Sequence, residues 1–184
     1  IILGILAIRK IDQSGGTFKF KESEPQLIWP KSFGRNIPSK IDGAVLWWKS
    51  SADWVVAAED LRWRGDGMQA DIDMQLQFHP DKPKPMLIVA AKLAPFGFDT
   101  AKRFWLRHIM PPSSIRWLDM ALEKGQVRDA SIVIAGDLEH WPFSDKNGRF
   151  SAHADIQAER FKFAADWPAA EQATLKADFN GPGF

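Results

Sequence analysis

The sequence contains no cysteine, which excludes a disulfide scaffold and metal sites built on thiolates. It also lacks tyrosine, although it has nine tryptophans and thirteen phenylalanines. Aromatic rings without a phenolic hydroxyl suit an apolar surface better than a hydrogen-bonding sugar site. Neither sign of charge dominates, since 24 lysines and arginines stand against 23 aspartates and glutamates. Without a basic run, nothing indicates a nucleic-acid partner.

No apolar run is long enough to span a membrane. The longest stretch near the start, Ile1 to Ile8, ends at Arg9-Lys10, and we expect it to be a buried strand. The first residue is not methionine, and the chain stops at Gly181-Pro182-Gly183-Phe184 without a tail. We therefore expect residues 1–184 to be one β-rich segment cut from a longer protein.

The clearest pattern in the chain is the strict alternation of residues 68–78. Every even position is apolar, and the odd positions between them are Gln69, Asp71, Asp73, Gln75 and Gln77. A period of two predicts a strand with one apolar and one polar face, about 37 Å long at roughly 3.4 Å per residue. A sheet built around such a strand needs a cover for its apolar face. That cover is either protein or an apolar ligand.

Other segments complete a mainly β, antiparallel sheet. Strands are predicted at 17–21, 44–49, 54–63, 86–93, 127–138, 150–158 and 175–179. Residues 26–37 are predicted to form a loop or an edge of the sheet. The alternation slips near Glu59-Asp60, as a β-bulge would cause. Gly65-Asp66-Gly67 predicts a tight turn, and Asn147-Gly148 carries a hairpin signal.

A change of period predicts a helical pair inserted at residues 99–124. Asp99 or Thr100 would cap the first helix, and Pro111-Pro112 would end it. Ser113 or Ser114 would cap the second helix, and Gly125 would close it.

Few side chains indicate catalysis. Asp71 and Asp73 share a strand face and could form a carboxylate pair or a cation site, but a solvated face is the better explanation, because glutamines share it. The histidines at 79, 108, 140 and 153 lack the spacing of a metal pair. Trp47-Trp48, Trp54 and Trp63 could stack on sugars, although cross-strand packing is the simpler interpretation. We expect no enzyme, no metal site and no cofactor.

An ordered set of short motifs lies in the second half of the chain. It comprises Met110-Pro111, Trp117-Leu118, Gly125, Gly136, Trp141-Pro142-Phe143, Gly148, Phe150 and Asp166-Trp167-Pro168. This order resembles the central region of AsmA-like envelope proteins of the YhdP type, and the resemblance covers residues 41–184. Trp141 stands where the family pattern has phenylalanine, a change that keeps an apolar ring at that position.

The resemblance implies a fold and a function. Such proteins are anchored in the Gram-negative inner membrane, extend through the periplasm, and form a long curved, taco-like β-sheet with an apolar groove that conducts phospholipids toward the outer membrane. They are not known as enzymes, so no catalytic residue is carried over. This segment would then contact phospholipid acyl chains and neighbouring β-segments of the same full-length chain, and the membrane only through parts outside it.

Two interpretations of the apolar face stay open. In the first, it lines a lipid groove, made of Met68, Ala70, Ile72, Met74, Leu76, Phe78, Ile132, Ile134, Phe150, Ala152, Ala154 and Ile156. In the second, the helical pair and a further sheet fill it, and the domain is a scaffold that docks protein partners and binds no lipid.

Overall fold

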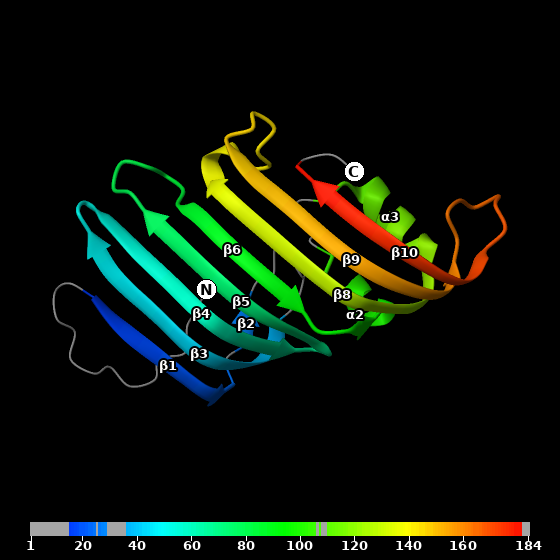
Figure 1. The fold of residues 1–184 in the computed structure, drawn as a ribbon, viewed down its shortest axis with the longest axis horizontal. Helices are drawn as coiled ribbons and strands as arrows, with labels where there is room; N and C mark the ends of the chain where they lie inside the picture. The colour runs from blue at the N-terminus through cyan, green and yellow to red at the C-terminus, as the bar shows by residue number, and fades with distance from the viewer. Residues whose placement is uncertain (1–14, 25, 29–35, 106, 108–109, 182–184) are drawn as a thin grey trace.

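The long strands form one open antiparallel sheet (Figure 1). The computed structural model describes residues 15–24, 26–28, 36–105, 107 and 110–181. Within these residues the sheet has ten strands in the order β1-β3-β4-β5-β6-β8-β9-β10, with β2 paired to β3 and β7 to β8. The predicted fold class is therefore confirmed. The strand expected at residues 1–8 lies outside the described residues.

Most strands are long and are joined to their neighbours by short connections. Their bounds are β1 Gly15–Ser23, β2 Gln26–Ile28, β3 Asn36–Ser50, β4 Asp53–Gly65, β5 Met68–Phe78, β6 Met86–Leu93, β7 Phe96–Gly97, β8 Leu122–Asp137, β9 Gly148–Phe161 and β10 Ala170–Asn180. Between them lie helices α2 Phe98–Arg103 and α3 Pro112–Ala121 and a single 3₁₀ turn, η1 Leu138–His140.

Strand β5 has the bounds that its alternation predicts, and it pairs along its length with β4 and β6. The turn before it also agrees with the prediction. Asp66 and Gly67 have φ angles of +49° and +81°, the left-handed pair that a tight two-residue hairpin needs to match strand twist. The predicted bulge is present as well, since the register of β4 against β5 shifts between Ala58 and Leu61.

The helices lie where the sequence predicts them, but the predicted caps are wrong. Helix α2 begins after Gly97 without a side-chain cap from Asp99 or Thr100, and it ends at Arg103, well before the prolines. Helix α3 begins at Pro112, with Pro111 as its N-cap, so Ser113 and Ser114 lie inside the helix. Proline is favoured in the first turn because the amide it lacks would have no partner there.

Gly125 also has a different role from the one predicted. Helix α3 ends at Ala121 and β8 follows directly, so Gly125 lies inside a strand, at a register shift against β9. Its φ is +148°, and an added Cβ would overlap the backbone of Gln157 and Ala158. Glycine is needed here for close approach in a bulge, not for a helix end.

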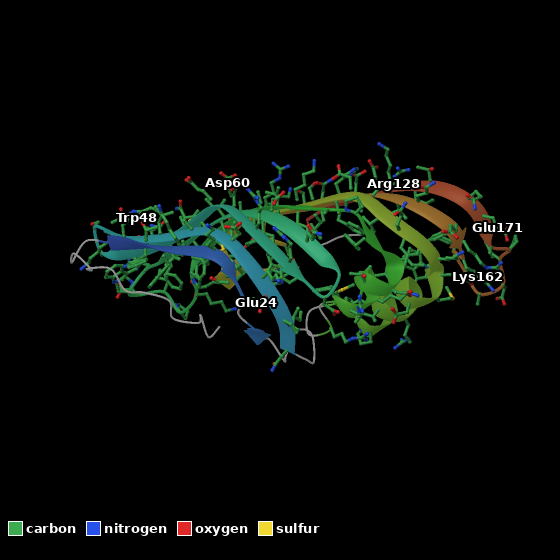
Figure 2. The ribbon with its side chains drawn as sticks, turned by 90° about the horizontal axis from the view of Figure 1, so that it is seen from below. Glu24, Trp48, Asp60, Arg128, Lys162 and Glu171 are labelled. Atoms are coloured by element: carbon green, nitrogen blue, oxygen red, sulfur yellow. The ribbon has the colours of Figure 1, made fainter. Side chains whose placement is uncertain are left out.

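The sheet is arched, and both helices lie on its concave side beneath the β8–β10 end (Figure 2). They cover a core cluster of Phe98, Leu122, Val127, Ala130 and Ala158, each less than a tenth exposed. Trp117 extends this contact, because its indole N–H donates to the Phe163 carbonyl at 2.8 Å, just beyond β9. The main core of the described residues is thus the interface between the helices and one end of the sheet.

Replacing Phe98 by alanine should lower the free energy of unfolding by about 3–5 kcal/mol, because removing a fully packed ring leaves a cavity. Urea denaturation followed by circular dichroism measures the change. The matched control is Phe163→Ala, at a ring that is 54% exposed, whereas Phe98 is 2% exposed. The control should cost much less, and equal losses would contradict this description of the core.

Candidate functional site

Rows of apolar side chains run across the concave face from strand to strand. Residues that lie directly opposite in an antiparallel pair share a face of the sheet. Met74 of β5 is opposite Ala58 of β4 and Val89 of β6. The complete first row, from β1 to β9, is Phe18, Val45, Ala58, Met74, Val89, Ile134 and Phe150.

Three further rows flank the first, and none of their members is charged. The second row is Leu61, Ile72, Ala91, Ile132, Ala152 and Phe179. The third is Ile41, Trp63, Ala70, Leu93, Ala130, Ala154 and Ala177. The fourth is Gly16, Trp47, Val56, Leu76, Leu87, Gly136 and Gly148. We call these four rows the apolar face.

The structure places every candidate lining residue on the side of the sheet that carries the apolar face. Met68 and Phe78 extend it at the two ends of β5, and Ile156 extends it opposite Val127. Sequence analysis missed the contributions of β4, β6 and β10, such as Val56, Val89 and Leu175. The alternation of those segments is visible in the sequence, but their partners in the sheet are not.

Exposure rises along β5 from one end of the apolar face to the other. Met68 and Ala70, at the end near the helices, are each 8% exposed. Ile72, Met74 and Leu76 are half-buried, and Phe78 reaches 42% exposure. On β5, the middle and the Phe78 end therefore keep part of their apolar surface exposed.

Besides Met68 and Ala70, two more candidate residues lie in the covered part. Ala154 and Ile156 pack against the core cluster beneath the helices. The same cluster takes Leu93 from β6 and Leu175 from β10. Protein thus fills the apolar face at this end.

An aromatic ring covers a second part of the apolar face. Phe143, in the β8–β9 connection, is 3% exposed, and its ring lies where side chains on Gly136 and Gly148 would otherwise stand. Trp141 packs edge-on against Phe143 and Phe150, with ring centroids 5.4 and 5.6 Å away. The connection is longer than the Asn147-Gly148 turn predicts, and the extra residues supply this cover.

The convex face carries the charges (Figure 2, with Asp60 and Arg128 labelled). Residues of opposite sign alternate across one of its rows, as cross-strand pairing favours. That row is Asp42, Arg62, Asp71, Lys92, Ser131, His153 and Asp178. Along this row the two faces of the sheet therefore differ in polarity, whereas neighbouring convex rows also carry apolar side chains such as Ile88 and Ala135.

The aspartates singled out in the sequence have separate surroundings. Asp71 stands between Arg62 and Lys92 in the charged row. Asp73 accepts a hydrogen bond of 2.8 Å from the Asp60 backbone N–H at the β-bulge. A carboxylate that satisfies a bulge amide has a structural role. Both are exposed on the convex face.

The described histidines pair with carboxylates, and His79 and His153 each lie near two of them. His140 Nδ1 lies 2.5 Å from Asp145, and His153 Nδ1 lies 2.7 Å from Asp178. The hydrogen bond to Asp178 raises the pKa of His153. No group of three His, Asp or Glu side chains that could hold a metal ion is found among the described residues.

The arrangement can hold an apolar ligand. The apolar face has neither a charged group nor a nucleophile in its rows. Apolar area removed from water supplies roughly 25 cal/mol per Å², and this energy has no direction, so a chain-like ligand could shift along the rows. Among the helices of the described residues, none is long and apolar enough to cross a membrane.

Comparisons with known proteins agree with this picture. Residues 8–184 match the family model described as YhdP protein. The intermembrane phospholipid transporter YhdP of Escherichia coli (strain K12) is 24% identical over 105 residues, which is 57% of this chain and 8% of that protein. The match thus spans under a tenth of the relative. No solved structure matches.

Replacing Asp73 by alanine should speed hydrogen exchange at the Asp60 amide and lower stability by about 1 kcal/mol, because it removes one charge-assisted hydrogen bond. Exchange followed by NMR measures the first effect, and urea denaturation the second. Asp71→Ala is the control and should leave the Asp60 amide protected. Unchanged exchange in Asp73→Ala would contradict the bulge role.

The pairing of His153 with Asp178 should make stability depend on pH. Because folding raises the His153 pKa, the stabilisation is fully present below the ordinary value of 6.5 and is lost as pH rises through the folded value. Asp178→Asn should therefore cost more stability at a mildly acidic pH, where Asp178 is still ionised, than at alkaline pH. NMR titration of His153 should show a lower pKa in the variant. Asp129→Asn, elsewhere on the convex face, should leave that titration unchanged.

Proposed function

Because the chain belongs to the YhdP protein family, we propose that it is a segment of a bridge that carries phospholipids between the inner and outer membranes of a Gram-negative bacterium. One observation carries the proposal: four uncharged rows cross the sheet on its concave face, and Ile72, Met74 and Leu76 at its middle are partly exposed. The segment would correspond to the central, periplasmic part of such a bridge, and it would transfer lipid without catalysing a reaction.

Acyl chains suit this surface. Burial of each methylene is worth about 0.8 kcal/mol, so a long chain is held without any specific polar contact. Because side chains within a row repeat with the spacing of the strands, a chain can move along a row while its buried area stays nearly constant. Met68 and Met74 add flexible side chains that adapt to irregular ligands. Selectivity among acyl chains should accordingly be loose.

Neighbouring β-segments of the same full-length chain would extend the surface. In the described residues, β1 pairs on one side with β3, and β10 pairs on one side with β9. An edge strand presents unpaired N–H and C=O groups that pair readily with another strand. The E. coli relative is many times longer than its matched stretch, which supports further segments at both edges.

A scaffold without lipid is the second candidate, and one observation favours it. The helices fill one end of the apolar face, and Phe143 fills a corner of it. If protein from outside the described residues also covers the middle, the domain would dock partners and bind no lipid.

Mass spectrometry of the purified protein separates the two. Phospholipid should co-purify and should be released by organic extraction. A lipid-free preparation that also takes up no fluorescent fatty acid would contradict lipid transport and favour the scaffold.

Met74→Asp should reduce co-purified phospholipid by roughly tenfold or more, because an ionised carboxylate in the middle of the first row costs several kcal/mol when acyl chains surround it. Lipid phosphorus per protein measures the loss. Gln75→Asp places the same charge on the opposite face of the same strand and should keep its lipid. Circular dichroism verifies that both variants are folded. Equal lipid content in the two variants would count against the concave face as the binding surface.

A further inference from the structure

Protein closes the concave side at one end of β3, β4 and β5. Ile37, Ser39 and Met68 lie there, and they are 0%, 4% and 8% exposed. The Trp63 indole N–H donates to the Ser39 hydroxyl at 2.9 Å. The Trp63 ring also packs edge-on against Phe104, with ring centroids 5.9 Å apart. We call these five residues the closed end, because their packing against one another already occupies the concave side there.

Helix α2 is joined to the turn at the closed end. Phe104 directly follows the helix. Arg103, its last residue, donates to the Asp66 carbonyl at 3.1 Å, and its guanidinium lies 3.5 Å from the Asp66 carboxylate. Arg103 also donates to the Thr100 hydroxyl at 3.0 Å, which fixes the guanidinium from the helix side. The β4–β5 turn and the helix therefore form one connected structure.

The opposite end of the same three strands is exposed on its concave side. Lys49, Trp54 and Phe78 lie opposite one another in the register and form one further row beyond the fourth. Trp54 is 44% exposed and Phe78 is 42% exposed. Among the described concave positions of β3, β4 and β5, Lys49 is the one that carries a charge. We call this row the open margin, because the apolar face meets water there.

The Trp54 side chain suits a boundary between hydrocarbon and water. The indole N–H groups of Trp63, Trp105 and Trp117 each donate to a protein acceptor, whereas no described residue accepts from the Trp54 N–H. Tryptophan combines a large apolar ring with one polar N–H, and it is enriched where one side of a site is apolar and the other is wet. Trp54 can thus contact acyl chains with its ring and keep its N–H in water.

The span between the closed end and the open margin matches one acyl chain in length. The steps from Ile72 to Phe78 cover about 20 Å of β5 at roughly 3.4 Å per residue. One acyl chain fills half of the hydrocarbon core of a bilayer, which is about 15 Å. A chain laid along the strand from Ile72 would therefore bring its ester and phosphate groups to the open margin.

We propose that phospholipids bind across the rows, with the ends of their acyl chains toward the closed end and their headgroups at the open margin. The proposal rests on the proposed function and adds an orientation to it. Because the open margin is in contact with water, the phosphate would stay solvated and would need no dedicated ion pair. A longer chain would move the headgroup outward, so selectivity among chains would stay loose. The lipid would travel sideways from strand to strand, with its headgroup following the β3–β4 and β5–β6 hairpins.

A chain without cysteine allows a site-specific test. Phe78→Cys and Ile72→Cys are each labelled with bimane in the purified protein. Each is then loaded with phosphatidylcholine that carries a nitroxide quencher either on the headgroup or near the end of an acyl chain. The headgroup nitroxide should quench the label at position 78 several-fold more than the label at position 72, because about 20 Å of strand separates them. The chain-end nitroxide should give the reverse order.

The matched control is Gln75→Cys, on the opposite face of the same strand, whose label neither lipid should quench. Circular dichroism verifies that all three labelled variants are folded. Equal quenching ratios at positions 72 and 78, or the reversed order, would overturn the orientation while leaving lipid binding intact. No quenching at either position would overturn the proposed function together with the orientation. Quenching at position 75 as strong as at the other two would mean non-specific adsorption and would overturn both.

Discussion

The pleat of the β-strand is the constraint on which this structure depends. Successive side chains must point to opposite faces, so a segment that alternates in sequence separates polarity in space. Direct cross-strand pairing then carries the separation from β5 to its neighbours. Ile72 continues into Leu61 and Ala91 on the concave face, while Asp71 continues into Arg62 and Lys92 on the convex face. Each further strand with this alternation extends the apolar face on one side of the sheet and the charged row on the other.

The apolar face is buried to different degrees along one sheet. At the helix end it is an ordinary core, where Phe98 and Ala158 are almost fully buried. Over the middle and toward Phe78 it stays partly in contact with water. The energy that fixes the fold is therefore concentrated where the helices pack. Under the proposed function, the remaining apolar area would bind lipid without making folding depend on that lipid.

Local features were predictable from the sequence, and features that depend on distant residues were not. The bounds of β5, the bulge at Glu59-Asp60 and the Gly65–Gly67 turn follow from alternation and from turn chemistry. The ends of the helices did not follow, because serine and proline both favour a first turn and their order does not decide between them. The role of Gly125 required knowledge of its neighbour in β9. For the candidate site, the apolar face was predictable from the alternation. The cover supplied by Phe143 was not, because the space for its ring exists only where Gly136 and Gly148 are paired.

The extra residue at Asp60 sets the parity of everything that follows it in β4. Before the bulge, the even residues Val56 and Ala58 lie on the apolar face. After it, the odd residues Leu61 and Trp63 lie on that face. Deleting one residue there would leave composition and length almost unchanged but would turn the rest of the strand over. Arg62 would then lie on the apolar face, and the Trp63 indole would lose its hydrogen bond to Ser39. Deleting a single residue is therefore enough to exchange the two faces of β4 beyond the bulge.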